Sequence, residues 1–414
     1  MIEDIQAARH RADLLDFLRA QKVIHTAAVD AAMTAIPRHL FLPGVPLETA
    51  YAPDDAVVTK RTADGAALSS ASAPRVVAAM LEQLDVQPGD RILEIGAGTG
   101  YNAALLAHLT GPTGTVTTID IDQDIVDGAR QALDATGYGN VRVICGDGEL
   151  GDSEGAPYDR IIATVGAWDL APAWLDQLAP DGTLVVPLRI HNNTTRSIAF
   201  DRTGSHLVSR SMNHCGFIPM RGIGQHTEPH IALTDNGDIT LLLSDEPDHD
   251  TAARLGRALT QPRTETWTGV IIPSGEPFQH LDLWLALTAP GFCRLIVRPA
   301  AINDGRVNPA FRWGGAAIAD TDSLAYLTMR TIAAPAGSDT ARAHIELGVC
   351  SHGPTADPLH HKFSEQILAW ERDHATGPGP RIEVHPADQD PPAGQIIIGK
   401  RGSSLAVSWP ATAT

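Results

Sequence analysis

The sequence of 414 residues has few cysteines, an excess of acidic over basic residues and no long apolar run. Its four cysteines are widely spaced and form no C-x-x-C pair, which argues against a disulfide framework and favours buried thiols in a reducing compartment. The 31 Lys and Arg residues against 49 Asp and Glu residues give a net charge of −18. Without a basic cluster, this charge argues against a nucleic-acid partner. The cysteines are Cys145, Cys215, Cys293 and Cys350.

The sequence also has no segment that predicts membrane insertion or export. No apolar run approaches the length of a membrane span, and the N-terminus, MIEDIQAARHRADLLDFLRA, is charged and patterned like a helix rather than a signal peptide. We therefore expect a soluble, cytoplasmic protein. Its length favours two domains.

Predicted strands and helices alternate regularly between residues 91 and 187. The hydrophobic pattern predicts helices over 2–35, 74–85, 101–109 and 122–135, and strands at 91–95, 115–119, 141–144, 161–163 and 184–187. Strands that alternate with helices over short connections indicate a parallel sheet with helices on both faces. The predicted fold class is thus α/β, a doubly wound Rossmann-like sheet.

Beyond about residue 220 the pattern changes. It predicts strands at 231–233, 239–243 and 268–272, and helices at 279–287 and 363–373. Near the N-terminus, Pro37 and Pro43 indicate an extended link at 38–43. Pro- and Gly-rich stretches at 335–337 and 376–396 read as loops. We expect three parts: an N-terminal helical and substrate-loop part at 1–87, a Rossmann-like domain at 88–220 and a C-terminal α+β domain at 221–414.

The strongest motif is Glu94-Ile95-Gly96-Ala97-Gly98-Thr99-Gly100, between a predicted strand and a predicted helix. Glycines allow a tight turn and let the backbone approach a ligand closely. Asp120, at the end of the next strand, can accept both ribose hydroxyls of an adenosine cofactor. Asp147, after the third strand, can hold the adenine amino group. A nicotinamide-dependent dehydrogenase is the main rival interpretation, but the glutamate before the first glycine favours a methyltransferase.

Residues 37–187 resemble the protein-L-isoaspartate O-methyltransferase family. The matching stretches follow the family's order, and they are Pro37-Arg38-His39, Ala50-Tyr51, Arg91–Tyr101 (RILEIGAGTGY), Asn140-Val141, Gly146-Asp147-Gly148, Tyr158-Asp159-Arg160-Ile161 and Leu184-Val185-Val186-Pro187. The resemblance implies S-adenosylmethionine as cofactor, with S-adenosylhomocysteine as product. The residues expected to bind the cofactor are Ser69, Ser70, Glu94, Gly96, Gly98, Gly100, Tyr101, Asp120, Asp147 and Gly148. No metal is expected.

One segment departs from the family's pattern. Repair enzymes of the family carry Thr-Ile-Ser-Gln-Pro, whereas this chain has Leu68-Ser69-Ser70-Ala71-Ser72-Ala73-Pro74. Ser72 falls on the family's active-site serine and is the candidate catalytic residue, while Ala73 replaces the glutamine. This replacement weighs against isoaspartate as substrate. A plain serine loop that caps the helix beginning at Pro74 is the structural alternative.

The added C-terminal half resembles extended homologues associated with ribosomally made peptide natural products such as lanthipeptides, lasso peptides and graspetides. Those enzymes methylate an aspartate of a modified precursor peptide and lead to aspartimide or isoaspartate. This resemblance implies that the partner is a precursor peptide, cyclised beforehand and recognised by the C-terminal domain. We expect the protein to be a monomer or a weak homodimer. An aspartate carboxylate is already ionised at neutral pH, so the reaction needs positioning rather than a general base.

Other interpretations stay open. They are repair of isoaspartyl residues in damaged proteins, methylation of a small molecule, and a binding module that retains the cofactor loop without turnover. His352, His360 and His361 suggest a metal site, but their sequence surroundings favour surface or capping histidines. The tryptophans read as core residues. Arg221 is a candidate for substrate contact, with a structural salt bridge as the more conservative interpretation.

Overall fold

The computed structural model describes residues 2–273, 278–333, 343–389, 391–392 and 395–410. The chain divides into two compact units. The first comprises Met1–Arg189, Thr195–His226 and Ile382–Ala406, and the second comprises Ile190–Thr194, Thr227–Arg381 and Val407–Thr414. None of the described helices is long and apolar enough to cross a membrane.

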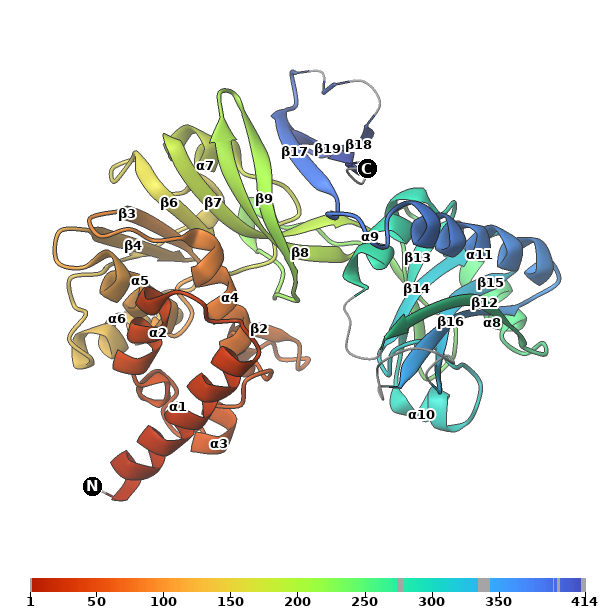
Figure 1. The fold of residues 1–414 in the computed structure, drawn as a ribbon, viewed down its shortest axis with the longest axis horizontal. Coiled ribbons are helices and arrows are strands. Elements are labelled where there is room, and N and C mark those ends of the chain that lie inside the picture. Colours follow the sequence, from red (N-terminus) through yellow and green to blue (C-terminus); the bar gives the residue numbers. More distant parts are fainter. Residues whose placement is uncertain (1, 274–277, 334–342, 390, 393–394, 411–414) are drawn as a thin grey trace. The chain divides into compact units, whose positions relative to one another are not determined.

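The N-terminal part of the first unit is helical (Figure 1). It contains α1 (Ile2–Ala20), α2 (Ala27–Ala35), the 3-10 helix η1 (Arg38–Phe41) and α3 (Leu47–Ala50). Thr26 caps α2, because its hydroxyl accepts a hydrogen bond from the Val29 N–H. The buried side chains of α1 and α2 join one apolar core with α4 (Pro74–Leu84) and α5 (Tyr101–Thr110). The extended link expected at 38–43 is wrong, because η1 turns the chain there.

A parallel sheet forms the centre of this unit. Its parallel strands lie in the spatial order β7-β6-β3-β4-β5, and α5 and α6 (Gln123–Ala135) connect successive strands. Figure 1 shows these strands beside their helices, which confirms the predicted doubly wound class. The strands are β3 (Arg91–Ile95), β4 (Thr115–Asp120), β5 (Arg142–Cys145), β6 (Tyr158–Ala163) and β7 (Leu178–His191), with α7 (Pro172–Gln177) before the last.

The same sheet continues through antiparallel strands that the sequence did not predict. After β7 come β8 (Thr194–Thr203) and β9 (His206–His214), and the chain returns later to add β17 (Arg381–Pro386), β19 (Ser403–Ser408) and β18 (Ile396–Gly399). Glu383 pairs with Val208 in this return. The structure therefore differs from the expected single domain at 221–414, because residues 382–406 complete the sheet of the first unit. The loop expected at 376–396 contains β17.

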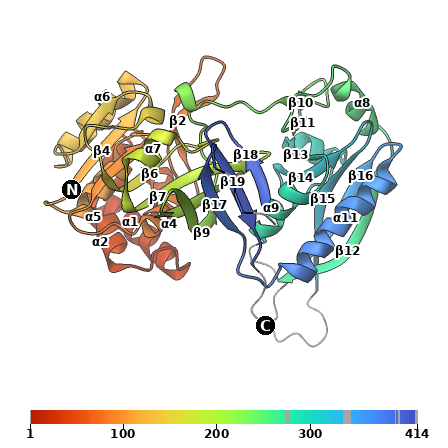
Figure 2. The same cartoon turned by 90° about the horizontal axis from the view of Figure 1, so that it is seen from above.

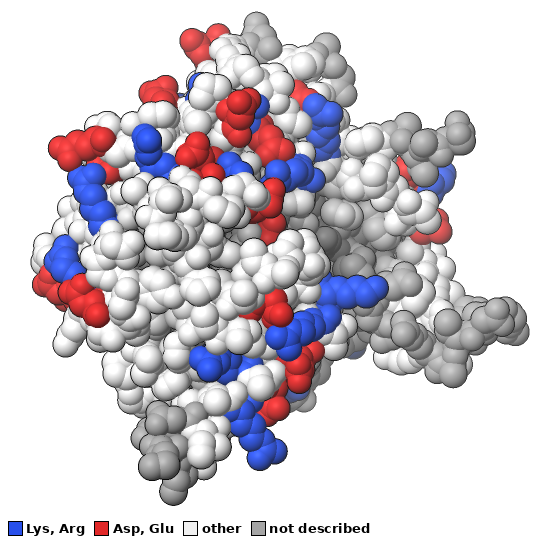
Figure 3. Space-filling model, turned by 60° about the vertical axis from the view of Figure 1, so that its left-hand side comes forward, with Lys and Arg blue, Asp and Glu red and all other residues white. Residues whose placement is uncertain are grey.

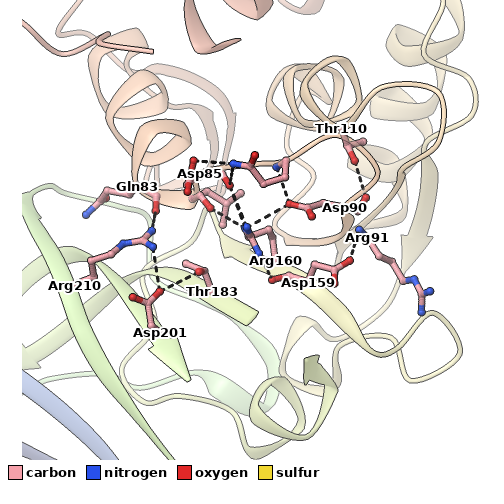
Figure 4. A network of polar contacts seen from close by, with 12 residues as sticks. Gln83, Asp85, Asp90, Arg91, Thr110, Asp159, Arg160, Thr183, Asp201 and Arg210 are labelled. Carbon is pink, nitrogen blue, oxygen red and sulfur yellow. Dashed lines mark hydrogen bonds and ion pairs between the residues drawn. The ribbon is translucent and has the colours of Figure 1, made fainter. Parts of the chain in front are cut away.

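Polar contacts secure the amino ends of the parallel strands (Figure 4). The backbone N–H of Arg91, at the start of β3, donates to Asp159 at the start of β6 (2.8 Å). Arg160 donates to the carbonyl of Leu84 at the end of α4 (3.0 Å) and lies 3.5 Å from Asp90. These contacts lie at the edge of the sheet opposite to the carboxyl ends of the strands. They hold β3 and β6 in register, and so position the loops that follow these two strands.

The second unit is built on an antiparallel sheet of seven strands in the order β10-β11-β13-β14-β15-β16-β12. Helices α9 (Gln279–Thr288) and α11 (Ala356–Asp373) share one apolar core with this sheet, and Figure 2 shows α11 running along it. A second core gathers Leu255 of α8 (Thr251–Ala258) and Ala301 of α10 (Pro299–Asn303). This agrees with the α+β class expected for the C-terminal half. The strands are β10 (His230–Ala232), β11 (Ile239–Leu242), β12 (Thr264–Pro273), β13 (Phe292–Val297), β14 (Gly314–Ala319), β15 (Leu324–Ile332) and β16 (His344–His352).

Several expectations for single residues need correction. His352 and His360 are buried, at 2% and 5% exposure, rather than on the surface. Both His360 and His361 lie in α11, which begins seven residues before the helix expected at 363–373. Cys145 is exposed, whereas the other three cysteines are buried and all four are free. Among the tryptophans, Trp174 is a core residue but Trp313 is 44% exposed. The expected loop at 335–337 lies outside the described residues.

The described residues contain no group of three or more His, Cys, Asp or Glu side chains that could hold a metal ion. On the face of the molecule shown in Figure 3, Lys and Arg side chains lie beside Asp and Glu side chains rather than in one basic patch. Among the described residues, Arg142 pairs with both Asp152 (2.9 Å) and Glu154 (2.8 Å).

Candidate active site

A pocket lies at the carboxyl ends of the central strands, where the direction of winding reverses between β3 and β6. In open α/β sheets, ligands bind at such a switch point. Residues after β3, β4 and β6 line the pocket, and the loop 217–221 after β9 adds a further wall. The pairing of Ile95 with Ile119 places the two strand ends side by side. As a result Gly96 N–H donates to the Ile119 carbonyl (2.8 Å).

The glycine-rich loop needs glycine for two different reasons. Gly96 has a φ of +101°, and a Cβ there would lie 2.7 Å from Oγ1 of Thr164. Gly98 has a φ of +51°, and its backbone N–H donates to the Asp120 carboxylate (3.1 Å). Positive φ values favour glycine. The backbone of this loop therefore approaches the pocket more closely than side chains would allow.

Glu94 is a buried acid at the end of β3. It is fully buried, and its carboxylate accepts hydrogen bonds from the Thr118 hydroxyl (2.6 Å) and the Asn102 side-chain amide (2.8 Å). Burial raises the pKa of Glu94 from 4.5 to about 7, although these two hydrogen bonds oppose the change. Glu94 thus contributes a carboxyl group to the pocket that exchanges its proton near neutral pH.

Two acids at the end of β4 have different environments. Asp120 lines the pocket, and burial raises its pKa. Asp122 lies closer to solvent and forms ion pairs with Arg221 (2.8 Å) and Lys60 (2.8 Å), which lower its pKa. Arg221 also lines the pocket. The suggestion that Arg221 forms a salt bridge is therefore confirmed, and that salt bridge lies at the pocket.

A β-hairpin carries the serines, where the sequence analysis expected a loop. It consists of β1 (Val57–Arg61) and β2 (Ala67–Ala71). Ser69 and Ser70 lie in β2, and Ser72 follows it directly. All three line the pocket. The alternative in which these serines cap α4 is wrong, because Ala73 occupies the N-cap position and no side chain caps that helix.

Arg38 holds the backbone around Ser72 in place. It is 1% exposed, and its guanidinium donates to the carbonyls of Ala50 (2.8 Å) and Ser72 (2.8 Å). It also lies over the ring of Tyr101, 5.1 Å from the centroid. Burial lowers the pKa of Arg38. In the sequence Arg38 is only part of a family motif, and no site role could be predicted for it, because an arginine in a predicted link gives no sign of burial.

Most of the residues predicted for the site lie around this one pocket. Two do not line it. Gly100 begins α5 with a φ of +83°, and a Cβ there would lie 3.2 Å from the Ala129 carbonyl. Asp147 caps the 3-10 helix η2 (Gly148–Leu150), and its carboxylate accepts from the backbone N–H groups of Glu149 (3.0 Å) and Ile223 (2.8 Å). The predicted residues that line the pocket are Ser69, Ser70, Ser72, Glu94, Gly96, Gly98, Tyr101, Asp120 and Gly148.

The outer wall of the pocket was predicted only at Arg221, the candidate for substrate contact. Phe217 and Met220 lie in the same loop after β9 and also line the pocket, but no sequence pattern marked them as site residues. The contact of Lys60 with Asp122 was also not predicted. The run Val57-Val58-Thr59 directly before Lys60 is nevertheless typical of a strand, and a charged residue there indicates an exposed one.

Comparisons with known proteins agree with this geometry. Residues 9–225 match the family model described as protein-L-isoaspartate(D-aspartate) O-methyltransferase. The chain belongs to this family. The matched region is wider than the resemblance at 37–187, and it ends one residue before His226, the last residue of the second segment of the first unit.

Two named relatives each match about half of the chain. The protein-L-isoaspartate O-methyltransferase of Methanopyrus kandleri is 35% identical over 231 residues, which are 55% of this chain and 99% of the relative. That of Methanococcoides burtonii is 38% identical over 191 residues, 46% of this chain and 90% of the relative. A solved protein-L-isoaspartate O-methyltransferase is 22% identical with a TM-score of 0.48, covering 87% of this chain and 92% of that one.

Family membership identifies the chain as an S-adenosylmethionine-dependent carboxyl O-methyltransferase. The residues of the pocket fit this cofactor. Two glycines with positive φ open the loop for close approach, and Asp120 offers a carboxylate at the position suited to ribose hydroxyls. The pocket also has two acids, Glu94 and Asp120, that can face a cationic ligand. When bound, S-adenosylmethionine supplies an electrophilic methyl group on its sulfonium.

Proposed function

We propose that this protein methylates a carboxylate of an aspartyl-derived residue in a peptide substrate. The observation that carries the proposal is that Ser72 lies in the same pocket as the glycine-rich loop and Asp120. A hydroxyl beside the cofactor site can orient a carboxylate oxygen toward the methyl group. Since a carboxylate is already ionised at neutral pH, with a pKa of about 3.9 for aspartate, no general base is needed. The protein's task is to position the two reactants and exclude water.

In this proposal different residues of the chain have different roles. Asp120 would accept hydrogen bonds from the ribose hydroxyls, the backbone of Gly96 and Gly98 would hold the cofactor, and Glu94 joins the end of β3 to Asn102 and Thr118. The rest of the pocket wall is formed by Ser69, Ser70, Tyr101 and Gly148. Two residues that do not line the pocket, Gly100 and Asp147, fix the backbone next to it. Ser72 orients the substrate carboxylate, and Arg38 holds Ser72 by its carbonyl (2.8 Å).

The better supported substrate is an isoaspartyl residue of a damaged protein. The relatives that the chain matches are named protein-L-isoaspartate O-methyltransferases, and the chain covers 99% of the one from Methanopyrus kandleri. The methyl ester formed is an activated acyl group. The backbone nitrogen of the next residue attacks it, methanol leaves, and a succinimide closes that can hydrolyse to aspartate.

A second candidate is an aspartate in a ribosomally made, modified precursor peptide, which would end as aspartimide or isoaspartate. Two observations favour it. Ala73 stands where repair enzymes carry glutamine, and the matched region stops at residue 225, so the second unit is available for recognition of a specific peptide. The enzyme would then act on its peptide as a monomer or a weak homodimer.

Paired serine variants test the roles proposed here. With an isoaspartyl peptide, S72A should lower kcat/KM about tenfold, the cost of one hydrogen bond to a charged group, and leave S-adenosylhomocysteine affinity unchanged. S70A should weaken S-adenosylhomocysteine binding instead. Equal effects of both variants on both quantities would contradict the division of roles.

A further inference from the structure

The turn between β18 and β19, residues 399–403, lies about 175 residues after the family-matched region ends, yet it reaches the pocket wall. Arg401 donates one hydrogen bond to the carbonyl of Ile223 (2.7 Å) and another to the carboxylate of Glu149 (2.5 Å). All three residues belong to the first unit. Arg401 therefore joins two segments that are separated by more than 70 residues in sequence.

Both partners of Arg401 are directly connected to the pocket. Ile223 follows the lining residue Arg221 by two positions, and its own N–H donates to Asp147 (2.8 Å). The backbone of Ile223 is thus fixed on both sides, since Asp147 accepts from its N–H and Arg401 donates to its carbonyl. Glu149 is 8% exposed and follows the lining residue Gly148, whose carbonyl accepts from the Trp174 indole (2.8 Å).

The contact between these segments is tight. A Cβ at Gly224 would lie 2.5 Å from the Glu149 carboxylate, and one at Gly222, which has a φ of +79°, would lie 2.2 Å from the Asp147 carboxylate. The loop 222–224 therefore packs directly against η2. A small displacement of Glu149 would move the wall formed by residues 217–221.

The turn that carries Arg401 is itself anchored. The backbone N–H of Gly402 and the hydroxyl of Ser403 both donate to Asp169 (2.6 and 2.5 Å), which is 7% exposed. Lys400 donates to the carbonyl of Arg189 (3.0 Å) and lies 4.6 Å from the ring centroid of Trp168. Arg401 is thus presented from a fixed backbone, so that less conformational entropy is lost when it pairs with Glu149.

We propose that Arg401 is a positioning residue for the cofactor pocket, which acts by fixing Ile223 and Glu149. The C-terminal return of the chain then completes the methyltransferase unit and is required for cofactor affinity. This role does not depend on which peptide the enzyme methylates, because its test measures cofactor binding alone.

The test is equilibrium binding of S-adenosylhomocysteine to the full chain. R401A should raise Kd about tenfold, as expected for losing a charge-assisted hydrogen bond at a partly exposed site. R401K should recover part of the affinity, since it keeps the charge beside Glu149 but not both donors. E149Q should also raise the Kd. The Kd of the double variant R401A/E149Q should lie within about twofold of that of R401A, because the effects of substitutions at two residues in contact do not add.

R372A is the matched control, because Arg372 also pairs with an acid, its neighbour Asp373, but is 69% exposed and belongs to the second unit. It should bind S-adenosylhomocysteine like the wild type. In turnover, R401A should raise KM for S-adenosylmethionine and leave kcat within about twofold. Unchanged Kd in R401A would overturn the proposal. So would a rise in Kd that R401K does not reduce and that accompanies a matching loss of thermal stability.

Discussion

Arg221 donates hydrogen bonds to both carboxylate oxygens of Asp122, at 3.2 and 2.8 Å. Lys60 of the β1–β2 hairpin donates to the same carboxylate (2.8 Å). One acid therefore joins the hairpin that carries Ser69 and Ser70 to the loop that forms the outer wall of the pocket. The ion pairs are only partly shielded, since Asp122 is 19% exposed and Arg221 is 30% exposed.

Replacement of Asp122 should distinguish the cofactor from its product. In D122N the lining residue Arg221 loses its carboxylate partner, whereas Lys60 keeps Asp124 (2.7 Å). S-adenosylmethionine carries a positive sulfonium, whereas the sulfur of S-adenosylhomocysteine is neutral. We expect the Kd of S-adenosylmethionine to rise roughly threefold more than that of S-adenosylhomocysteine at low salt, with the difference shrinking as salt screens the charges.

Calorimetric titration of both ligands measures this difference, and D127N is the matched control on α6, because Asp127 is 61% exposed. An equal change for both ligands in D122N would contradict an electrostatic role of the Asp122 cluster.

The buried Glu94 predicts a pH dependence of stability in the ligand-free protein. Its pKa in the fold is about 7, above its ordinary value of 4.5, so the fold favours the protonated form. The stabilisation of the folded state by protonated Glu94 is complete below about pH 4.5, and it is lost as the pH rises through about 7. Relative to E94Q, which stays neutral, the wild-type unfolding midpoint should therefore fall over this range.

Thermal unfolding of the two proteins at a series of pH values gives the difference directly. A constant offset between wild type and E94Q would mean that Glu94 does not change its protonation in this range.

Glycine at position 96 is required by space as well as by backbone conformation. In G96A the new methyl group would lie 2.7 Å from Thr164 Oγ1 and 3.0 Å from Val165. We expect S-adenosylhomocysteine affinity to fall by about two orders of magnitude, with a stability loss on the order of 1–3 kcal/mol. G128A is the control, because Gly128 lies inside α6 with open space around it, and it should be up to about 1 kcal/mol more stable. Cofactor binding by G96A at wild-type strength would contradict the proposed site.

Removal of the Arg38 guanidinium should impair catalysis more than cofactor binding. R38M keeps most of the side-chain length but leaves the carbonyls of Ala50 and Ser72 without their donor. We expect kcat/KM for an isoaspartyl peptide to fall about tenfold, with S-adenosylhomocysteine Kd within about twofold of the wild type. R61M is the control, since Arg61 is exposed on the hairpin and donates to the nearby Gly65 carbonyl (2.9 Å). Full peptide activity of R38M would show that Ser72 needs no such support.

The parallel sheet could be predicted from the sequence because its signals are local. Each buried strand is a short apolar run, as at β3, and each helix carries its own periodic pattern. The glycine-rich loop and Asp120 follow directly from their positions at strand ends. For this reason most of the predicted site residues lie around the pocket that the structure forms.

The remaining parts depend on contacts between distant residues. Val384 of β17 pairs with Leu207 of β9, and nothing in the local sequence around Val384 specifies that partner. For the same reason a truncation after residue 220, designed from the sequence, would remove both Arg221 and Arg401. It would damage the first unit, so that loss of activity could not show which of the two candidate substrates, a damaged protein or a precursor peptide, the enzyme methylates.

The burial of charged residues could not be predicted from the sequence either. Arg38 stands in a segment that looks like an exposed link, whereas in the fold η1 and the carbonyls of Ala50 and Ser72 give its buried guanidinium hydrogen-bond partners. The hairpin was missed although the β-branched run Val57-Val58-Thr59 and the turn Asp64-Gly65 were both present, because short exposed strands have no apolar alternation.

Mass spectrometry of methyl transfer tests the central claim most directly. The full-length enzyme and S-adenosylmethionine are incubated with an isoaspartyl peptide, the same peptide with ordinary aspartate, and a cyclised aspartate-containing precursor peptide. We predict the gain of one methyl group on the isoaspartyl peptide, followed by loss of methanol to the succinimide. Methylation of the precursor alone would establish the second candidate substrate. If none of the three gains a methyl group while S-adenosylhomocysteine binds with full affinity, the claim that this is a peptide carboxyl methyltransferase is contradicted.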